Sequence, residues 1–207
     1  MDILTKNSLI SLKKKTLRTK VRAQRRALSP IQQKTASALL HKHLERSLIL
    51  LRTTHIALYL GTDGEICPKA LISHYLKRKK KLYLPIVHPI KKNHLVFCPI
   101  TAKTKLKKNN FGILEPDFRS NSCMLPSLLS MVLLPLVAFD AKGNRMGMGG
   151  GYYDRAFEFK QKTSRNSPIL VGLAHELQKQ EQLATEPWDI PLFAIFTDQQ
   201  IYRPEKV

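Results

Sequence analysis

Short apolar runs alternate with amphipathic segments along this chain. The runs typical of strands lie at residues 55–60, 82–87, 94–98, 131–138, 169–173 and 193–196. Residues 8–28, 29–47 and 68–79, and the stretch from Tyr153 onward, have the composition of helices. A strand that is apolar on both faces needs cover on both sides. The pattern therefore predicts a three-layer α/β/α fold, Rossmann-like, with a mostly parallel central sheet and an N-terminal basic helix.

The second helix has a well-defined start. Ser29 is suited to cap it, Pro30 fits the first helical position, and Gln32 completes a capping box. Residues 101–130 show no such periodicity and are expected to form loops or short turns.

The length of 207 residues indicates a single domain over residues 1–207, with residues 1–13 as a candidate flexible arm. Cys67, Cys98 and Cys123 include no C-x-x-C pair, so we expect reduced thiols and a cytoplasmic location. The longest apolar run is too short to span a bilayer, and no membrane association is expected. We also expect a monomer.

The charge balance is strongly basic, with a formal net charge of +20. Lysine and arginine gather in residues 1–30, 77–81 and 103–108. Clustered cations bind nucleic acid through counterion release. However, no aromatic side chains interleave with these runs and no recognised nucleic-acid motif is present. We therefore expect no specific nucleic-acid partner, and a basic surface equally suits small polyanionic ligands.

Five glycines crowd into the segment from Gly143 to Gly151, between an apolar run and a helical stretch. A strand, a glycine-rich turn and a helix together present backbone N–H groups to an anion. The segment is not a P-loop, because no Lys-Ser or Lys-Thr pair follows the glycines, and a dinucleotide fingerprint would need glycine at Tyr152. Arg145 can clamp phosphate oxygens and Asp154 can reach a metal. The alternative is a flexible turn.

The string from Phe139 to Asp154 resembles the signature of the 5-formyltetrahydrofolate cyclo-ligase (5,10-methenyltetrahydrofolate synthetase) family. Further motifs resemble the same family in the same order. They are Lys14-x-x-Leu17-Arg18, Arg25-Arg26-x-Leu28-Ser29, Tyr59 to Glu65, Phe111-Gly112-Ile113-x-Glu115-Pro116, Gly172-Leu173-Ala174 with Gln178, and Pro187-x-Asp189. The resemblance extends from about residue 14 to residue 198.

This resemblance implies an enzyme, an ATP- and Mg²⁺-dependent ligase that closes 5-formyltetrahydrofolate to 5,10-methenyltetrahydrofolate. The implied route passes through a phosphorylated formyl intermediate and releases ADP and phosphate. The substrate is a folate that can carry a polyglutamate tail. Two alternatives stay open from the sequence: a basic nucleic-acid-binding protein, and another small-molecule phosphotransferase on the same scaffold.

The resemblance also implies roles for individual residues. The ATP-binding set is Lys14, Arg18, Arg145, Gly147, Gly149, Gly150, Gly151, Tyr152 and Tyr153. The substrate-binding set is Leu60, Glu65, Phe111, Met148 and Tyr152. Arg145 and Tyr152 are the candidate catalytic residues, and Asp154 and Asp189 the candidate magnesium ligands. Lys13 and Lys15 remain register alternatives to Lys14. Two positions depart from the family pattern: Met148, which is often basic or aromatic in relatives, and Trp188, where histidine is common.

Overall fold

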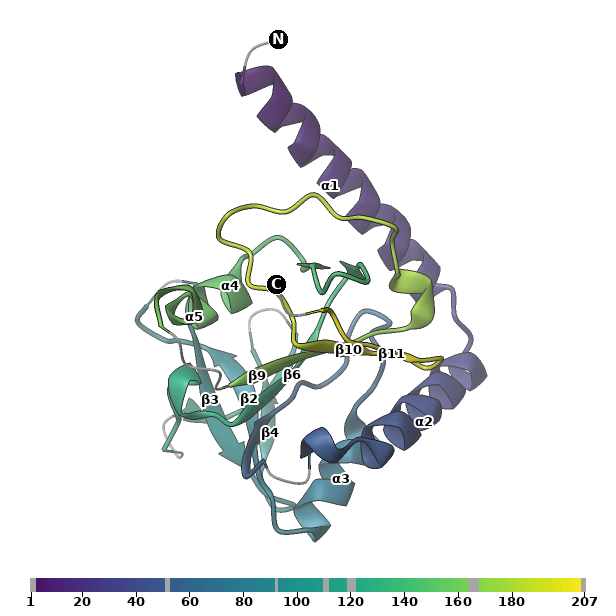
Figure 1. The fold of residues 1–207 in the computed structure, drawn as a ribbon. Helices are drawn as coiled ribbons and strands as arrows, with labels where there is room; N and C mark the ends of the chain where they lie inside the picture. Colours follow the sequence, from purple (N-terminus) through teal and green to yellow (C-terminus); the bar gives the residue numbers. More distant parts are fainter. Residues whose placement is uncertain are drawn as a thin grey trace.

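A computed structural model describes residues 3–50, 53–91, 93–109, 112–118, 122–163 and 168–205, with side chains from residue 10 onward (Figure 1). Its centre is a seven-stranded sheet in the order β11-β10-β9-β6-β1-β2-β3. The strands are β1 (His55–Ala57), β2 (Lys81–Val87), β3 (Leu95–Ile100), β6 (Met131–Pro135), β9 (Ile169–Leu173), β10 (Ala194–Phe196) and β11 (Ile201–Tyr202). Pairing is parallel from β10 to β2 and antiparallel at the two edges, β11 and β3.

Helices cover both faces of this sheet (Figure 1). In β6, Met131 and Leu133 pack into one apolar cluster, and the alternate residues Val132 and Leu134 pack into another. Side chains two apart on a strand share a face, so the two clusters lie on opposite faces. The first cluster includes residues of α2 (Pro30–Arg46) and α3 (Lys69–Lys77), and the second includes residues of α4 (Tyr152–Phe157) with α5 (Phe159–Lys162) beside it. The predicted α/β fold with a mostly parallel sheet is confirmed.

The capping box at the start of α2 is also confirmed. The Gln32 N–H donates to Ser29 Oγ at 3.2 Å, and the Ser29 N–H donates to Gln32 Oε1 at 2.8 Å. Two backbone N–H groups that the helix leaves without an internal partner are thereby satisfied.

Helix α1 (Ile3–Arg26) is longer than the sequence suggested at its start, and residues 3–13 are part of it. Its N-terminal end projects from the body, while its C-terminal end packs on the fold (Figure 1). Val21 and Arg25 are buried there. Arg22, Arg25 and Arg26 all donate to the carboxylate of Asp63, in the turn after β1. This end of α1 is thus fixed to the sheet's carboxyl edge.

Three expectations about irregular segments and cysteines need correction. The apolar run ending at Phe139 is two strands, because the chain leaves the sheet after β6 and forms a hairpin of β7 (Ala138–Phe139) and β8 (Arg145–Met146). Asp140 shapes this hairpin, since its Oδ1 accepts from the N–H groups of Lys142 and Asn144. The glycine-rich segment therefore begins in the turn of this hairpin, and it does not directly follow a strand of the main sheet.

The second correction concerns residues 101–130, which contain a separate two-stranded ribbon of β4 (Leu106–Lys108) and β5 (Leu114–Pro116). Short 3-10 helices occur at η1 (Leu48–Leu50), η3 (Pro126–Leu128) and η4 (Glu176–Gln178).

The third correction concerns the cysteines. Cys98 in β3 and Cys123 form a disulfide, so the expectation of reduced thiols is wrong for this pair, and Cys67 is free. Among the helices of the described residues, none is long and apolar enough to cross a membrane.

Candidate functional site

The glycine-rich segment adopts backbone conformations that favour glycine. Gly149 has φ +101° and Gly151 has φ +63°, a region that L side chains rarely adopt. A Cβ at Gly151 would lie 2.8 Å from Nη1 of Arg155, so the Arg155 side chain would have to move to accommodate it. The segment ends where α4 begins, with Gly151 as the N-terminal cap. Its backbone is thereby held in a tight turn against neighbouring arginines.

Two cations of α1 reach this region of the fold. Arg18 Nε donates to the Gly147 carbonyl at 2.9 Å, and its guanidinium lies against Gly149. One turn earlier, Lys14 Nζ pairs with Glu186 Oε1 at 2.9 Å, in the loop that runs beside α1 (Figure 1). Lys13 and Lys15 are exposed, whereas the Lys14 side chain is only 15% exposed. Of the three lysines that could match the lysine of the family motif, Lys14 is the one that faces the fold.

Arg145 links the hairpin to α4. Its Nη2 donates to Asp154 Oδ1 at 2.6 Å, and its Nη1 donates to the Ile190 carbonyl. The side chain of Arg145 is 5% exposed and that of Asp154 is 26% exposed, so this ion pair is partly shielded from water. The Ile190 N–H also donates to Asp154 Oδ1, at 3.4 Å. These contacts place Arg145 and Asp154 beside the segment that carries Asp189.

The two candidate magnesium ligands therefore lie on adjoining segments, and each uses one carboxylate oxygen in these contacts. Asp154 uses Oδ1, and Asp189 uses Oδ2 to accept from the Glu186 N–H at 2.8 Å. In the part of the chain that the structure describes, neither belongs to a cluster of three or more metal-binding side chains. Mg²⁺ commonly takes one or two carboxylates and completes its shell with water and phosphate oxygens. The donor set fits that pattern.

The adjacent tyrosines have different surroundings. Tyr152 is half-buried, with the Arg155 guanidinium 5.8 Å from its ring centre. Tyr153 stacks on Phe157, with ring centres 6.3 Å apart. Burial raises the pKa of Tyr153 well above its ordinary value, and the nearby charge of Glu65 raises it further. The glycine-rich segment and the turn that carries Glu65 are therefore close enough to interact electrostatically.

Glu65 lies in the turn after β1 and is held from several sides. Its Oε2 accepts from the Thr62 N–H at 3.1 Å, and its Oε1 lies 3.8 Å from Nη2 of Arg25. Burial raises the pKa of the Glu65 carboxyl, while hydrogen bonds from Thr62 and the charge of Arg25 act in the opposite direction. Leu60, the other candidate from this strand end, is half-buried and packs against the core. The turn thus presents a preorganised, partly desolvated carboxylate.

The remaining residues named from the sequence differ in how the fold holds them. Met148 is 53% exposed and Trp188 is 62% exposed, so neither is fixed by packing. Phe111 lies outside the described residues. Gly147 and Gly150 belong to the segment described above: the Gly147 carbonyl accepts from Arg18, and the Gly150 carbonyl accepts from Arg155.

Two arginines that organise the site were assigned no role from the sequence, although Arg25 belongs to one of the family motifs. Arg25 is fully buried and donates to the Asp63 carbonyl at 2.8 Å and the Leu136 carbonyl at 3.2 Å, joining α1 to the turn and to the sheet. Arg155 donates to the carbonyls of Gly150 and Asn93. The spacing of Arg22, Arg25 and Arg26 on one helix face is the signal that could have revealed a shared acidic partner.

Comparisons with known proteins agree on one family. A family model described as the 5-formyltetrahydrofolate cyclo-ligase family matches residues 10–198. The 5-formyltetrahydrofolate cyclo-ligase of Haemophilus influenzae is 42% identical over 183 residues, covering 88% of this chain and 96% of that protein. The Escherichia coli protein of the same name is 35% identical over 182 residues, covering 88% of this chain and 98% of its own.

A solved structure extends the agreement to three dimensions. The NMR structure of Aquifex aeolicus 5,10-methenyltetrahydrofolate synthetase matches with a TM-score of 0.79 and 29% identity, covering 94% of each chain. The fold, the ordered motifs and the two full-length relatives point the same way, and the chain belongs to the 5-formyltetrahydrofolate cyclo-ligase family.

Proposed function

We propose that this protein is a ligase that closes 5-formyltetrahydrofolate to 5,10-methenyltetrahydrofolate, using ATP and Mg²⁺ and releasing ADP and phosphate. Family membership supports the reaction class. The observation that carries the assignment of the site is the approach of two α1 cations to the glycine-rich region, with Arg18 donating to Gly147 at 2.9 Å. Cations and backbone N–H groups at one place suit a triphosphate.

On this proposal, the backbone N–H groups of Gly147, Gly149, Gly150 and Gly151 surround the phosphates, with Lys14 and Arg18 supplying positive charge. Lys14 would exchange its half-buried partner Glu186 for a phosphate oxygen, an exchange that a flexible lysine makes readily. Tyr152 and Tyr153 would border the nucleotide. Arg145, already oriented by Asp154, would stabilise charge that develops on the transferred phosphoryl group.

Asp154 and Asp189 are the residues that would hold Mg²⁺. They would do so through the carboxylate oxygens that make none of the contacts described above, Asp154 Oδ2 and Asp189 Oδ1. When bound, the ion neutralises phosphate oxygens. Arg145 then has a second role, because its ion pair orients the Asp154 carboxylate.

The folate would lie across the Glu65 turn. Its carboxylate would accept hydrogen bonds from pterin N–H groups, with Leu60, Phe111, Met148 and Tyr152 as apolar or aromatic contacts. Glu65 and Tyr153 interact electrostatically, so the pterin and phosphate regions would adjoin. Positioning of the two substrates is the main catalytic contribution on this proposal, with Arg145 and Tyr152 at the reacting groups.

The proposed chemistry has two steps. The formyl oxygen attacks the γ-phosphorus, and the bond from that phosphorus to the β,γ-bridging oxygen breaks, which releases ADP. The second folate nitrogen then attacks the formyl carbon and loses its proton to water or the departing phosphate, and phosphate leaves with the former formyl oxygen. The resulting methenyl bridge joins both nitrogens.

We further propose a monomer that acts in the cytoplasm. ATP, the proposed co-substrate, is a cytoplasmic metabolite. The disulfide between Cys98 and Cys123 instead supports a location outside the cytoplasm, because such bonds persist in oxidising compartments. Thiol labelling of the protein in freshly lysed cells would decide between the two expectations.

The test of the activity is the absorbance of the methenyl product. Purified protein should form it only when both ATP and Mg²⁺ are present.

A pair of variants tests the nucleotide site. Arg18→Ala should raise the KM for ATP, whereas Lys13→Ala, which removes an exposed cation from the same helix, should leave the KM unchanged. Folded protein that yields no product under these conditions would contradict the proposal. ATP turnover with another acceptor would favour a different phosphotransferase, and salt-sensitive RNA binding that ATP does not displace would favour a nucleic-acid-binding protein.

A further inference from the structure

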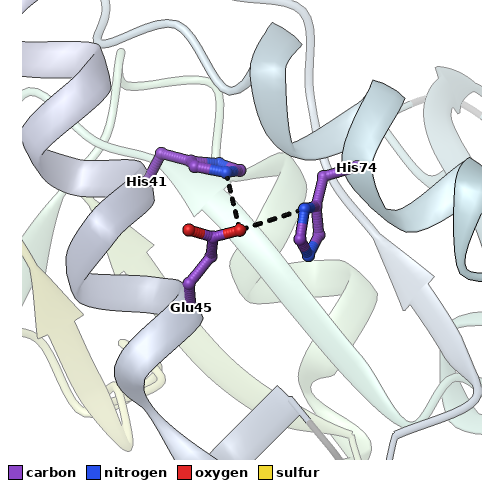
Figure 2. Close-up of side chains that lie close together, drawn as sticks. All are labelled: His41, Glu45 and His74. Carbon is purple, nitrogen blue, oxygen red and sulfur yellow. Dashed lines mark ion pairs between the residues drawn. The ribbon is translucent and has the colours of Figure 1, made fainter.

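A second group of polar side chains lies on α2 and α3, on the opposite face of the sheet from α4. His41 and Glu45 are one turn apart on α2, and His74 lies on α3 (Figure 2). Both imidazole rings point at the same carboxylate oxygen. His41 Nε2 is 3.1 Å from Glu45 Oε1, and His74 Nδ1 is 3.0 Å from it.

The three atoms that converge are the donors that metal sites use. Across the described part of the chain, His41, Glu45 and His74 form the one group of three such residues, with ligand atoms within 4.8 Å of one another. Four ligands at the usual zinc bond lengths of 2.0–2.2 Å are separated by about 3.3 Å in a tetrahedron. The two oxygen–nitrogen separations are already close to that value, and the third separation, between the two imidazole nitrogens, is within 4.8 Å.

The burial of the rings indicates that the convergence is built into the fold. The side chains of His41 and His74 are 20% and 19% exposed, and the rings meet edge to face with centres 5.2 Å apart. Their outer nitrogens, His41 Nδ1 and His74 Nε2, are buried without a hydrogen-bond partner among the described atoms. Each ring therefore directs its polar contact to Glu45. By contrast, His43 on the same helix contacts the Thr197 carbonyl at 3.1 Å.

Space for further ligands adjoins the group. A hollow of about 260 Å³ is lined by Glu45, His74 and Tyr75, among others, and is large enough for several waters. Arg78 and Lys80 also line this hollow, and their positive charges oppose a cation. The ligand set therefore favours an ion with strong affinity for imidazole over the hard ion Mg²⁺, which prefers oxygen.

We propose that His41, Glu45 and His74 bind one divalent transition-metal ion of the zinc class, with water at the remaining position. The ion joins α2 to α3 and so fixes two helices of the same layer. It is separate from the magnesium proposed at Asp154 and Asp189, and it stabilises the folded chain in proportion to its occupancy.

The experiment uses tag-free protein stripped with a chelator. Calorimetric titration with Zn²⁺ should give one site per chain, and Zn²⁺ should raise the melting temperature. His41→Gln and His74→Gln should each weaken Zn²⁺ binding by more than about 100-fold, since loss of outer-shell partners alone costs 10–100-fold. His43→Gln, on the same helix, is the matched control and should bind as the wild type does. A large excess of Mg²⁺ should not displace the ion.

The wild-type protein provides a readout that does not depend on the folding of the variants. Zn²⁺ should shift the imidazole nitrogen resonances of two histidines only, and Co²⁺ should give the visible bands of a site with low coordination number. Absence of stoichiometric binding, equal binding by the three glutamine variants, or displacement by Mg²⁺ would each overturn the proposal. The group would then be a hydrogen-bonded network and no metal site.

Discussion

Glu65 is the residue in which burial and function are most directly opposed. Its carboxylate is shielded from water in the turn after β1, and the protein compensates with Thr62 and with the buried guanidinium of Arg25. Burial still raises the pKa of Glu65 above the ordinary value of 4.5. If Glu65 accepts hydrogen bonds from the pterin, as proposed, this carboxylate is neutralised at a higher pH than an exposed one.

This opposition predicts a pH dependence of folate binding. In the wild type, Glu65 takes up a proton as the pH falls, beginning above 4.5, so the KM for folate should rise as the pH is lowered from neutrality. Glu65→Gln should raise the KM at pH 7.5 roughly 10- to 100-fold, since a hydrogen bond to a charged group contributes about 1.5–3 kcal/mol. Its KM should no longer vary over this pH range.

Steady-state kinetics from pH 5 to 8 would test this, with the exposed Glu205→Gln as control. A wild-type KM that stays flat over the range, or a Glu65→Gln variant with an unchanged KM, would remove Glu65 from substrate binding.

Among the elements, the glycine-rich segment depends on its backbone conformation. Gly149→Ala places a side chain at φ +101°, next to the Arg18 guanidinium, and should cost about 1–3 kcal/mol in the free energy of unfolding. Gly147→Ala is the matched control, because its Cβ would meet nothing within 4 Å and its φ is not positive. That control should stay within about 0.5 kcal/mol of the wild type.

Urea unfolding would measure both glycine variants. The KM for ATP should also rise in Gly149→Ala if the segment binds phosphate. Equal stability of the two variants would show that the turn tolerates a side chain at either position.

The anchor of α1 is a second element-scale feature with a defined pH dependence. Burial alone would raise the pKa of Asp63, but hydrogen bonds from Arg22, Arg25 and Arg26 hold it well below the ordinary value of 3.8. A depressed carboxyl pKa contributes stability that is present above 3.8 and is lost as the pH falls below it. Asp63→Asn should therefore cost up to roughly 3–5 kcal/mol at pH 7, because the buried Arg25 then keeps only Glu65, at 3.8 Å, as a carboxylate partner.

Unfolding curves at pH 7, 5, 4 and 3 would follow this difference, which should shrink only at the most acid values. Asp117→Asn, which removes an exposed ion pair with Lys107, should have little effect at any of them. A difference between wild type and Asp63→Asn that stays constant down to pH 3 would argue against the arginine cluster as its cause.

Elements with a local signature were predictable from the sequence. The capping box at Ser29 and the apolar runs of β2 and β9 depend on neighbouring residues, and both were confirmed. The strand β4 was not predictable, because all its residues are exposed and it lacks an apolar face. The burial of Arg25 was equally hidden, since its partner Asp63 lies 38 positions away and a basic run normally indicates a solvated surface.

At the scale of the whole molecule, the net charge of +20 should act on the approach of ATP. Exposed charges are screened beyond about 10 Å at 0.1 M salt. The KM for ATP should therefore rise several-fold as KCl is increased from about 0.02 M to about 0.3 M, through slower association. Stopped-flow binding of a fluorescent ATP analogue would measure the association rate directly, and a rate that does not change with salt would exclude steering.

The order of the strands has a consequence for synthesis on the ribosome. After β1, β2 and β3, each new parallel strand joins one side of the sheet in the order of the chain: β6, then β9, then β10. The acidic anchor of α1 emerges early, with Asp63, but the partners of Arg18 and Lys14 emerge only with Gly147 and Glu186. A nascent chain would thus hold its first helix by one end for most of translation, and would become able to bind nucleotide only near its completion.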